Sequence, residues 1–439
     1  MEFLTNFGTN LGAFIVVLGV MIFFHEFGHF ITAKGFGMRV FIFSFGFGKR
    51  LIGFKWGDTD CRVSAIPLGG YVKLEGELDD KLSEEVSAAG DGRDFTSRPR
   101  WQRIVVYLAG PAFNFLLTIG LLTSLYMIGF GVDATRYDRP IIGSVEAGSS
   151  AEAAGLRSGD EILSIDGTSL KDWEAAQYNI LIRPDTEVLL EIRRDGVVET
   201  LTAQTTSGED KAGHLGVRPL VRIGAVSEDG AAHKAGLQTD DAILRIGDEA
   251  VTTFNDLPKI IGAAGDEELL FTVWRDGREL EMAIAPVGGL IGVGSKMVIQ
   301  RFGFIGAVGE SVSWSWNMTR QTFQILGRLV TAQLSPKTMM GPIGIAKASG
   351  DAARGGVLQV VFLVAVISLQ IGILNLFPVP PLDGGHLAIL FGESILRRDF
   401  SLAVKMWIMN AGAAALFLLI GLVLYSDLSK TSLLGRFLP

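Results

Sequence analysis

Four long apolar blocks constrain this chain more than any other feature. They run roughly from Leu11 to Ile31, Ile104 to Phe130, Val357 to Phe377 and Val404 to Tyr425. Each is about 20 residues or longer, and a helix rising about 1.5 Å per residue then spans a hydrocarbon core of about 30 Å. The positive mean hydropathy of +0.36 also fits a chain with several membrane-spanning segments. The sequence therefore predicts a multi-pass α-helical membrane protein with four transmembrane helices.

Lysine and arginine predict its orientation. Residues 32–103 carry twelve of them, whereas none precedes the first block. Basic loops stay on the cytoplasmic side, and Arg397, Arg398 and Lys405 put the last connection there too. Both termini and the region 131–356 are then expected outside. The net charge of −8 argues against a nucleic-acid partner, because phosphate binding needs a basic surface.

The first block carries the string His25-Glu26-Phe27-Gly28-His29. Histidines four apart share one helix face and can bind one metal ion, and a glutamate between them is placed as a general base. His25 lies about 21 Å along the helix from Leu11, which puts it within the membrane towards the cytoplasm. Polar side chains without partners cost on the order of several kcal/mol inside the membrane, so a metal site is favoured over residues without a functional role.

A third ligand is expected after the third block, in the stretch 375–386. Three prolines must break the helix, and they bring Asp383 to the depth of the two histidines. Two histidines and a carboxylate suit a hydrolytic zinc ion, with His386 as a less favoured rival ligand. Cys61 is the only cysteine, so a thiolate cluster is excluded.

Between the first two blocks, aromatic and β-branched residues interrupted by glycine occupy 39–74, with a turn-like sequence at 57–60. They favour β-hairpins over helix. This element either lies on the membrane surface or re-enters the membrane beside the metal, where a free edge could bind an extended substrate. A polar linker, 79–100, follows. In the second block, Asn114 either seeks a polar partner or serves as helix-packing glue.

An internal repeat lies between the second and third blocks. Gly143-Ser144-Val145 and the residues after it recur 81 positions later at Gly224-Ala225-Val226, and the register holds through two Arg-Asp-Gly turns. Two copies of a small β-rich domain are predicted. The pattern from Gly155 to Gly167 resembles the PDZ domain, which binds peptide ends. His214-Leu215-Gly216-Val217 precedes the second copy as a carboxylate-binding loop would, and no clear counterpart precedes the first. The copies could equally be spacers or steric guards.

These motifs together resemble the bacterial intramembrane zinc metalloproteases of the site-2 protease family, RseP type. The resemblance implies metal ligands His25, His29 and Asp383, Glu26 as catalytic base, Zn²⁺ as cofactor, and a fold of four transmembrane helices with a re-entrant β element plus two periplasmic PDZ-like domains. Asn375 and Pro378 match positions that grip the substrate. The residues of the re-entrant element expected to contact the substrate are Gly69, Gly70 and Tyr71.

The expected segments follow the chain. They are the first helix (1–34), the β loop and linker (35–103), the second helix (104–130), the two PDZ-like domains (131–217 and 218–290), amphipathic interfacial helices (296–350), the third helix with its Leu-Asp-Gly-Gly motif (357–386) and the fourth helix (404–425).

The resemblance also implies a bacterial inner-membrane enzyme, acting as a monomer in the lipid bilayer. Its expected substrates are single-span membrane proteins such as anti-sigma factors, cleaved in regulated intramembrane proteolysis, and remnant signal peptides. A PDZ scaffold or chaperone with a structural metal, or a zinc-dependent transporter or regulator, is the alternative. Neither needs the base that Glu26 supplies.

Overall fold

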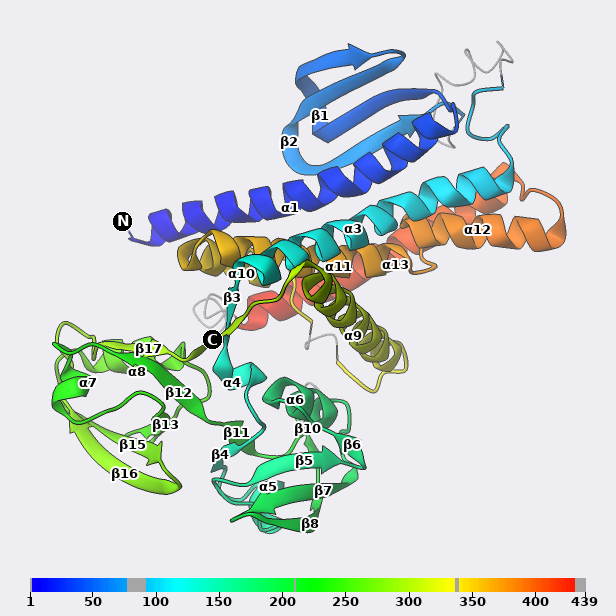
Figure 1. Ribbon diagram of the computed structural model, residues 1–439. Coiled ribbons are helices and arrows are strands. Elements are labelled where there is room, and N and C mark those ends of the chain that lie inside the picture. Colours follow the sequence, from blue (N-terminus) through cyan, green and yellow to red (C-terminus); the bar gives the residue numbers. More distant parts are fainter. Residues whose placement is uncertain (1, 77–91, 209–210, 336–338, 431–439) are drawn as a thin grey trace, which may run out of the picture. The chain divides into compact units, whose positions relative to one another are not determined.

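The computed structural model describes residues 2–76, 92–208, 211–335 and 339–430 (Figure 1). The chain divides into two compact units. The first comprises Met1–Ile128, Arg301–Arg328 and Met339–Pro439, and the second comprises Gly129–Gln300 and Leu329–Thr338. Most of the expected linker lies outside the described residues.

The first unit is mainly helical. Its helices are α1 (Glu2–Gly35), α3 (Arg100–Ile128), α9 (Phe304–Val330), α10 (Pro342–Gly355), α11 (Val357–Asn375), α12 (Asp383–Leu396) and α13 (Leu402–Lys430). Within the described ranges, four stretches are long and apolar enough to cross a membrane: Gly8–Gly35, Arg100–Ile128, Val357–Asn375 and Leu402–Leu428. They coincide with the four apolar blocks, and the chain fits a membrane protein with additional β-rich regions.

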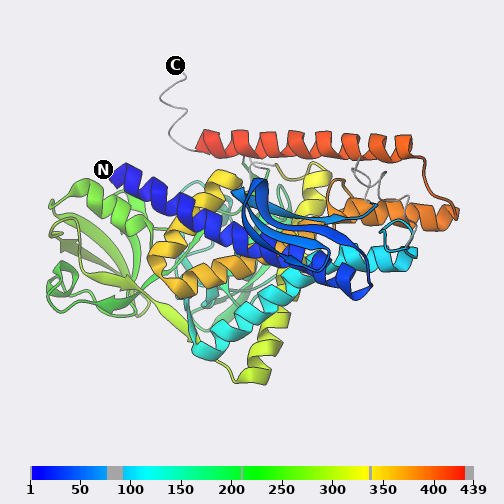
Figure 2. The ribbon, with the colours of Figure 1, turned by 90° about the horizontal axis from the view of Figure 1, so that it is seen from above.

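Small residues let these helices approach one another closely. A Cβ atom at Gly28 of α1 would lie 2.4 Å from the carbonyl oxygen of Ala109 in α3, and one at Gly372 of α11 would lie 3.2 Å from the Cβ atom of Asn114. Packing through glycine is typical of membrane helices, where no hydrophobic effect drives their association. Helix α3 thus lies against both α1 and α11 (Figures 1 and 2).

The third apolar helix ends earlier than expected. Helix α11 stops at Asn375, and Asp383 opens the separate helix α12, because proline supplies no N–H for a continuing helix. Glycine is required where α12 folds back on the connection: a Cβ atom at Gly384 would lie 2.2 Å from the carbonyl oxygen of Phe377. The break therefore places Asp383 in the first turn of a new helix.

The expected hairpin is confirmed in β1 (Val40–Trp56) and β2 (Thr59–Leu74), joined by a turn at Gly57 and Asp58. Residues 42–45 of β1 pair on one side with 70–73 and on the other with 60–63, so the hairpin folds back on itself. Among the described strands, residues 70–74 therefore pair with β1 alone. This end of β2 forms an edge of the small sheet.

The second unit contains the two predicted copies. The first comprises β4 (Ile142–Val145), α5 (Ser150–Ala153), β5 (Glu161–Ile165), β6 (Thr168–Ser169), α6 (Trp173–Leu181), β7 (Glu187–Arg194), β8 (Val197–Gln204), β9 (Thr206–Ser207), β10 (Gly213–His214) and β11 (Val217–Pro219). The second comprises β12 (Val221–Val226), α7 (Ala231–Lys234), β13 (Ala242–Ile246), β14 (Glu249–Ala250), α8 (Asp256–Ala264), β15 (Leu269–Arg275), β16 (Arg278–Ile284) and β17 (Val293–Ser295). Strands β3 (Phe130–Asp133) and β18 (Met297–Gln300) pair at the ends of the unit, where α4 (Ala134–Tyr137) follows β3.

An ion pair between a buried aspartate and a partly buried arginine recurs in both copies. Arg194 donates two hydrogen bonds to Asp160, at 2.8 and 2.7 Å, and Arg275 donates two to Asp241, at 2.7 and 2.6 Å. Both aspartates are almost fully buried. Each arginine opens the Arg-Asp-Gly turn that the sequence predicted, so the same contact fixes this turn in both copies.

The sequence prediction for His214-Leu215-Gly216-Val217 is wrong, because the segment serves the first copy. The Ala151 N–H donates to the Leu215 carbonyl oxygen at 2.9 Å, and Val217 pairs with Val145 of β4. In the second copy the equivalent acceptor is the carbonyl oxygen of Ile291, which binds the Ala232 N–H at 2.9 Å. Each copy is thus closed by a strand that follows it in sequence, so no counterpart could be found upstream.

The closing strands also change the extent of the copies. The first copy continues to Pro219 and the second to Ser295, beyond the expected limits at 217 and 290. The amphipathic segment expected from 296 begins with strand β18, and its helices are α9 and α10.

Candidate active site

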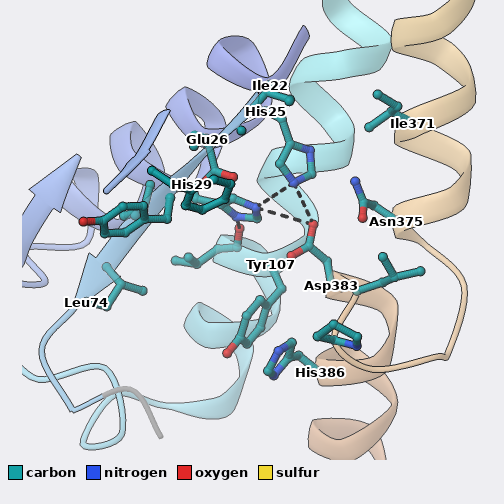
Figure 3. A pocket seen from close by; sticks show the side chains of 18 residues that line it. Ile22, His25, Glu26, His29, Leu74, Tyr107, Ile371, Asn375, Asp383 and His386 are labelled. Atoms are coloured by element: carbon teal, nitrogen blue, oxygen red, sulfur yellow. Dashed lines mark hydrogen bonds and ion pairs between the residues drawn. The ribbon is translucent and has the colours of Figure 1, made fainter. Parts of the chain in front are cut away.

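Three side chains from two helices meet at one point in the first unit (Figure 3). The Nε2 atoms of His25 and His29 lie 3.2 Å apart, and the Asp383 Oδ2 atom lies 3.2 Å from the first and 3.4 Å from the second. Within the described residues, one group of His, Cys, Asp or Glu side chains lies close enough together to hold a metal ion, and it is this one.

The donor set fits a metal ion. In a tetrahedral site with bonds of about 2.0 Å, ligand atoms are about 3.3 Å apart, which matches the three distances. The Asp383 Oδ2 atom is buried and has no hydrogen-bond donor among the described residues. A buried carboxylate oxygen without a donor is costly, and a cation between the three ligand atoms would satisfy it.

Groups on α3 orient both imidazoles. The Nδ1–H of His29 donates to the Val106 carbonyl oxygen at 2.8 Å, which leaves the Nε2 lone pair directed at the other ligands. His25 Nδ1 lies 3.3 Å from the Asn114 side-chain amide, whose Oδ1 atom is buried without a partner among the described residues. Because the two ends of an amide are nearly isosteric, Asn114 can present Oδ1 as an acceptor to the His25 Nδ1–H.

Helix α3 can approach the imidazoles because residue 110 is glycine. A Cβ atom at Gly110 would lie 2.3 Å from His29 Nε2 and 2.8 Å from His25 Cε1. Any side chain would therefore displace both histidines. The sequence did not predict this contact, because the spacing of residues on α3 does not reveal which side of α1 Gly110 faces.

Glu26 lies beside the imidazoles and faces the same cavity, which has a volume of about 490 Å³ (Figure 3). The edge of the β hairpin forms one wall. A Cβ atom at Gly70 would lie 3.0 Å from Glu26 Cγ, and the backbone of Val72 forms a hydrogen bond with the Glu26 carboxylate. The Glu26 carboxylate, the group of three side chains that could hold a metal ion and a sheet edge thus share one cavity.

The residues expected to contact substrate divide into two groups. Gly69, Gly70, Tyr71 and Asn375 line the cavity, whereas Pro378 is exposed and is not part of its lining. His386, the rival ligand, also lines the cavity but is not part of the three-ligand group.

Tyr107 was not found from sequence. Its ring stacks on the His386 imidazole, with centroids 4.8 Å apart and planes at 8°. The Val106 carbonyl acceptor was missed too, because a backbone group carries no signal in the sequence.

The geometry defines a class, because paired imidazoles, a carboxylate ligand and a neighbouring glutamate are the parts of a metal-dependent hydrolase. The family model described as Peptidase family M50 matches residues 13–419. The chain belongs to this family and is a metalloprotease.

Individual relatives support this family assignment. The chain is 32% identical to the regulator of sigma-E protease RseP of Escherichia coli K12, with 97% of this chain and 99% of the relative covered. It is 33% identical to the protease RseP of Yersinia pestis, with 96% and 98% covered. A Vibrio cholerae relative whose name carries the words zinc metalloprotease is 32% identical, with 97% and 100% covered.

Proposed function

We propose that this chain is an intramembrane zinc endopeptidase that cleaves transmembrane segments of membrane proteins. One observation carries the proposal: the Glu26 carboxylate and the group of His25, His29 and Asp383 share a cavity with a sheet edge, and the first three of these residues in sequence lie within a candidate membrane span. Ionisable groups inside a membrane helix are expensive and usually functional.

In this proposal His25, His29 and Asp383 hold the zinc ion. Bound there, zinc supplies a Lewis acid that activates water and polarises the scissile carbonyl. The Val106 carbonyl and the Asn114 amide keep the two imidazoles in the ligating tautomer. The zinc metalloprotease name of the Vibrio cholerae relative supports the choice of metal.

Glu26 acts as the general base. It takes a proton from the attacking water and later gives it to the leaving amine nitrogen, which becomes the new amino terminus. Its position beside His25 and His29 suits this role, because a base must lie within hydrogen-bond reach of the proton that it removes. A hydrogen bond with the backbone of Val72 holds the Glu26 side chain against the hairpin.

The hairpin edge presents the substrate. A helical substrate keeps its carbonyl groups in internal hydrogen bonds, so the scissile region must unwind before attack. Apart from the hydrogen bond between the Val72 backbone and Glu26, residues 70–74 pair with β1 and with no other described strand, so an extended segment could add there as a further strand. Gly69, Gly70 and Tyr71 would contact this segment, and the Asn375 amide would bind its backbone. Pro378 acts at most by shaping the turn after α11, since it lies outside the cavity lining.

The two β-rich copies act as PDZ-like domains on the outer, periplasmic side of a bacterial inner membrane. The charge asymmetry around the first helix supports this orientation. The copies would filter substrates by size or bind their trimmed ends. The name of the Escherichia coli relative, a regulator of sigma-E protease, supports anti-sigma factors as one substrate type, beside remnant signal peptides.

The test is cleavage of a single-span membrane substrate by purified full-length chain in lipid. Wild type should cut it, and Glu26→Gln should lower the rate by at least about 100-fold while keeping the metal, because only the base is lost. Glu310→Gln, the same change on α9 outside the cavity lining, should be silent. Asp383→Asn should lower bound zinc, measured by elemental analysis.

Equal cleavage by wild type and Glu26→Gln would favour the alternative, a PDZ scaffold with a structural metal. Unchanged zinc content in Asp383→Asn would remove this residue from the ligand set.

A further inference from the structure

We call the part of the cavity lined by Val72, Leu74, Val106, Tyr107 and His386 the apolar arm. Its floor is the stacked pair of Tyr107 and His386, and its walls include Val72, Leu74 and Val106. In Figure 3 the stacked pair lies below the ligands, whereas Asn375 lies to their right. The arm is therefore a region of the cavity apart from the side that Asn375 lines.

Short covalent connections tie the arm to the metal ligands. Tyr107 directly follows Val106, whose carbonyl oxygen binds His29. His386 follows Asp383 by three residues on α12, so it lies on the same helix face about 4.5 Å further along the axis. Both rings of the floor thus have fixed positions relative to the reacting centre.

The hairpin edge leads into the same arm. Side chains two apart on a strand point to the same side, so Gly70, Val72 and Leu74 all face α1 and α3. Gly70 lies beside Glu26, and Leu74 packs in the buried cluster that contains Val106 and Tyr107. A segment paired with this edge would therefore place a side chain over the arm about 7 Å from the residue beside Glu26.

The arm suits an apolar side chain. Leu74, Val106 and Tyr107 are each less than a tenth exposed, and the Tyr107 and His386 rings present a flat stacked floor. A charged side chain placed there would lose its hydration against an apolar wall, which is costly. A long or wide side chain would meet the aromatic floor.

We infer that Tyr107 and His386 form the floor of a specificity subsite that accepts an apolar substrate side chain next to the scissile bond, and that Tyr107 sets the largest size accepted. This inference rests on the proposed protease function. It assigns Tyr107 a role in choosing the cleavage position rather than in the chemical step.

The competing explanation is that Tyr107 only fills the core. Its ring also meets Phe95 edge-on, with centroids 5.3 Å apart, and belongs to the same buried cluster as Leu390. Leu390 does not line the cavity. Leu390→Ala therefore loosens this cluster without changing the arm, and provides a matched control for Tyr107→Ala.

The experiment uses full-length chain in lipid and single-span substrates that differ at one position near the scissile bond, which mass spectrometry locates. Ala, Leu, Trp and Asp are compared by kcat/KM. Wild type should favour Leu over Trp and Asp at one position. Tyr107→Ala should raise the ratio of Trp to Leu cleavage about 10-fold, in the range that pocket size typically controls. Leu390→Ala should leave this ratio unchanged.

An unchanged ratio in Tyr107→Ala, or the same change in Leu390→Ala, would overturn the subsite. If Tyr107→Ala is too unstable to assay, Tyr107→Trp decides: it should lower cleavage of the Leu substrate relative to Ala, and an unchanged ratio overturns the inference. The Glu26→Gln variant separates the two proposals. If wild type cuts no better than Glu26→Gln, the protease function fails, whereas a Glu26-dependent cut with no effect of Tyr107 defeats only the subsite.

Discussion

Two aspartate–arginine pairs of the second unit and one histidine–aspartate group of the first unit use buried charged side chains differently. In the second unit, Asp160 with Arg194 and Asp241 with Arg275 form the same hydrogen-bonded pair in each copy, 81 residues apart. In the first unit, His25, His29 and Asp383 form a single group without an arginine or lysine partner, and one of its carboxylate oxygens has no donor among the described residues.

This difference separates structural polar groups from reactive ones. A pair that recurs with the repeat and satisfies itself holds a turn in place, and nothing remains to bind a ligand. A group that occurs once, faces a cavity and leaves an acceptor unsatisfied has capacity for a metal ion. Mutations in the recurring pairs should lower stability without affecting metal binding. Mutations at the group that faces the cavity should lower metal binding without lowering stability.

The largest effect is expected from Gly110→Ala. The new Cβ atom would lie 2.3 Å from His29 Nε2, so the imidazoles must move, and misplacement by about 1 Å can cost about 100-fold in rate. Both cleavage and bound zinc should fall. Gly120→Ala on the same helix has open space around the new atom and should be silent. Full activity of Gly110→Ala would show that the close approach of α3 does not shape the site.

A smaller effect, on stability alone, is expected from Asp241→Ala and Asp160→Ala. Each change removes a buried aspartate that accepts two hydrogen bonds from a partly buried arginine, and should lower the free energy of unfolding of its copy by about 1 to 3 kcal/mol. Hydrogen exchange of the full-length chain measures this copy by copy, with bound zinc unchanged. Asp248→Ala, which removes a fully exposed carboxylate, is the control. Loss of zinc from either variant would contradict the separation of roles.

The smallest effect is expected from Asn114→Ala, which removes the group beside His25 Nδ1. Loss of such an outer partner typically lowers metal affinity about 10- to 100-fold, so zinc should be lost at lower chelator concentrations. Ser368→Ala is matched to it, because Ser368 binds the backbone carbonyl of Asn114 and not the imidazole. Equal zinc affinity in wild type and Asn114→Ala would show that Asn114 contributes to helix packing only.

Features that follow from composition, from a repeat or from a regular spacing along the chain were predictable. The four apolar blocks gave four candidate membrane helices, because helix length and hydrocarbon thickness are matched by composition alone. The 81-residue repeat gave two β-rich copies with the same turns. The placement of His25 and His29 on one face follows from 3.6 residues per turn, and the proline-rich break predicted that Asp383 would join them.

Only the tertiary structure decided which groups surround these residues. The Val106 carbonyl lies 77 residues from His29 in sequence, and Asn114 lies 89 from His25. Which face of α3 meets α1 depends on the packing of glycines at 28 and 110, and which strand closes each copy depends on pairing across about 70 residues. The sequence by itself determined the metal-binding pattern and its setting in an apolar helix. The stacking of Tyr107 on His386, and hence the apolar arm, arose from helix rotations that no local periodicity encodes.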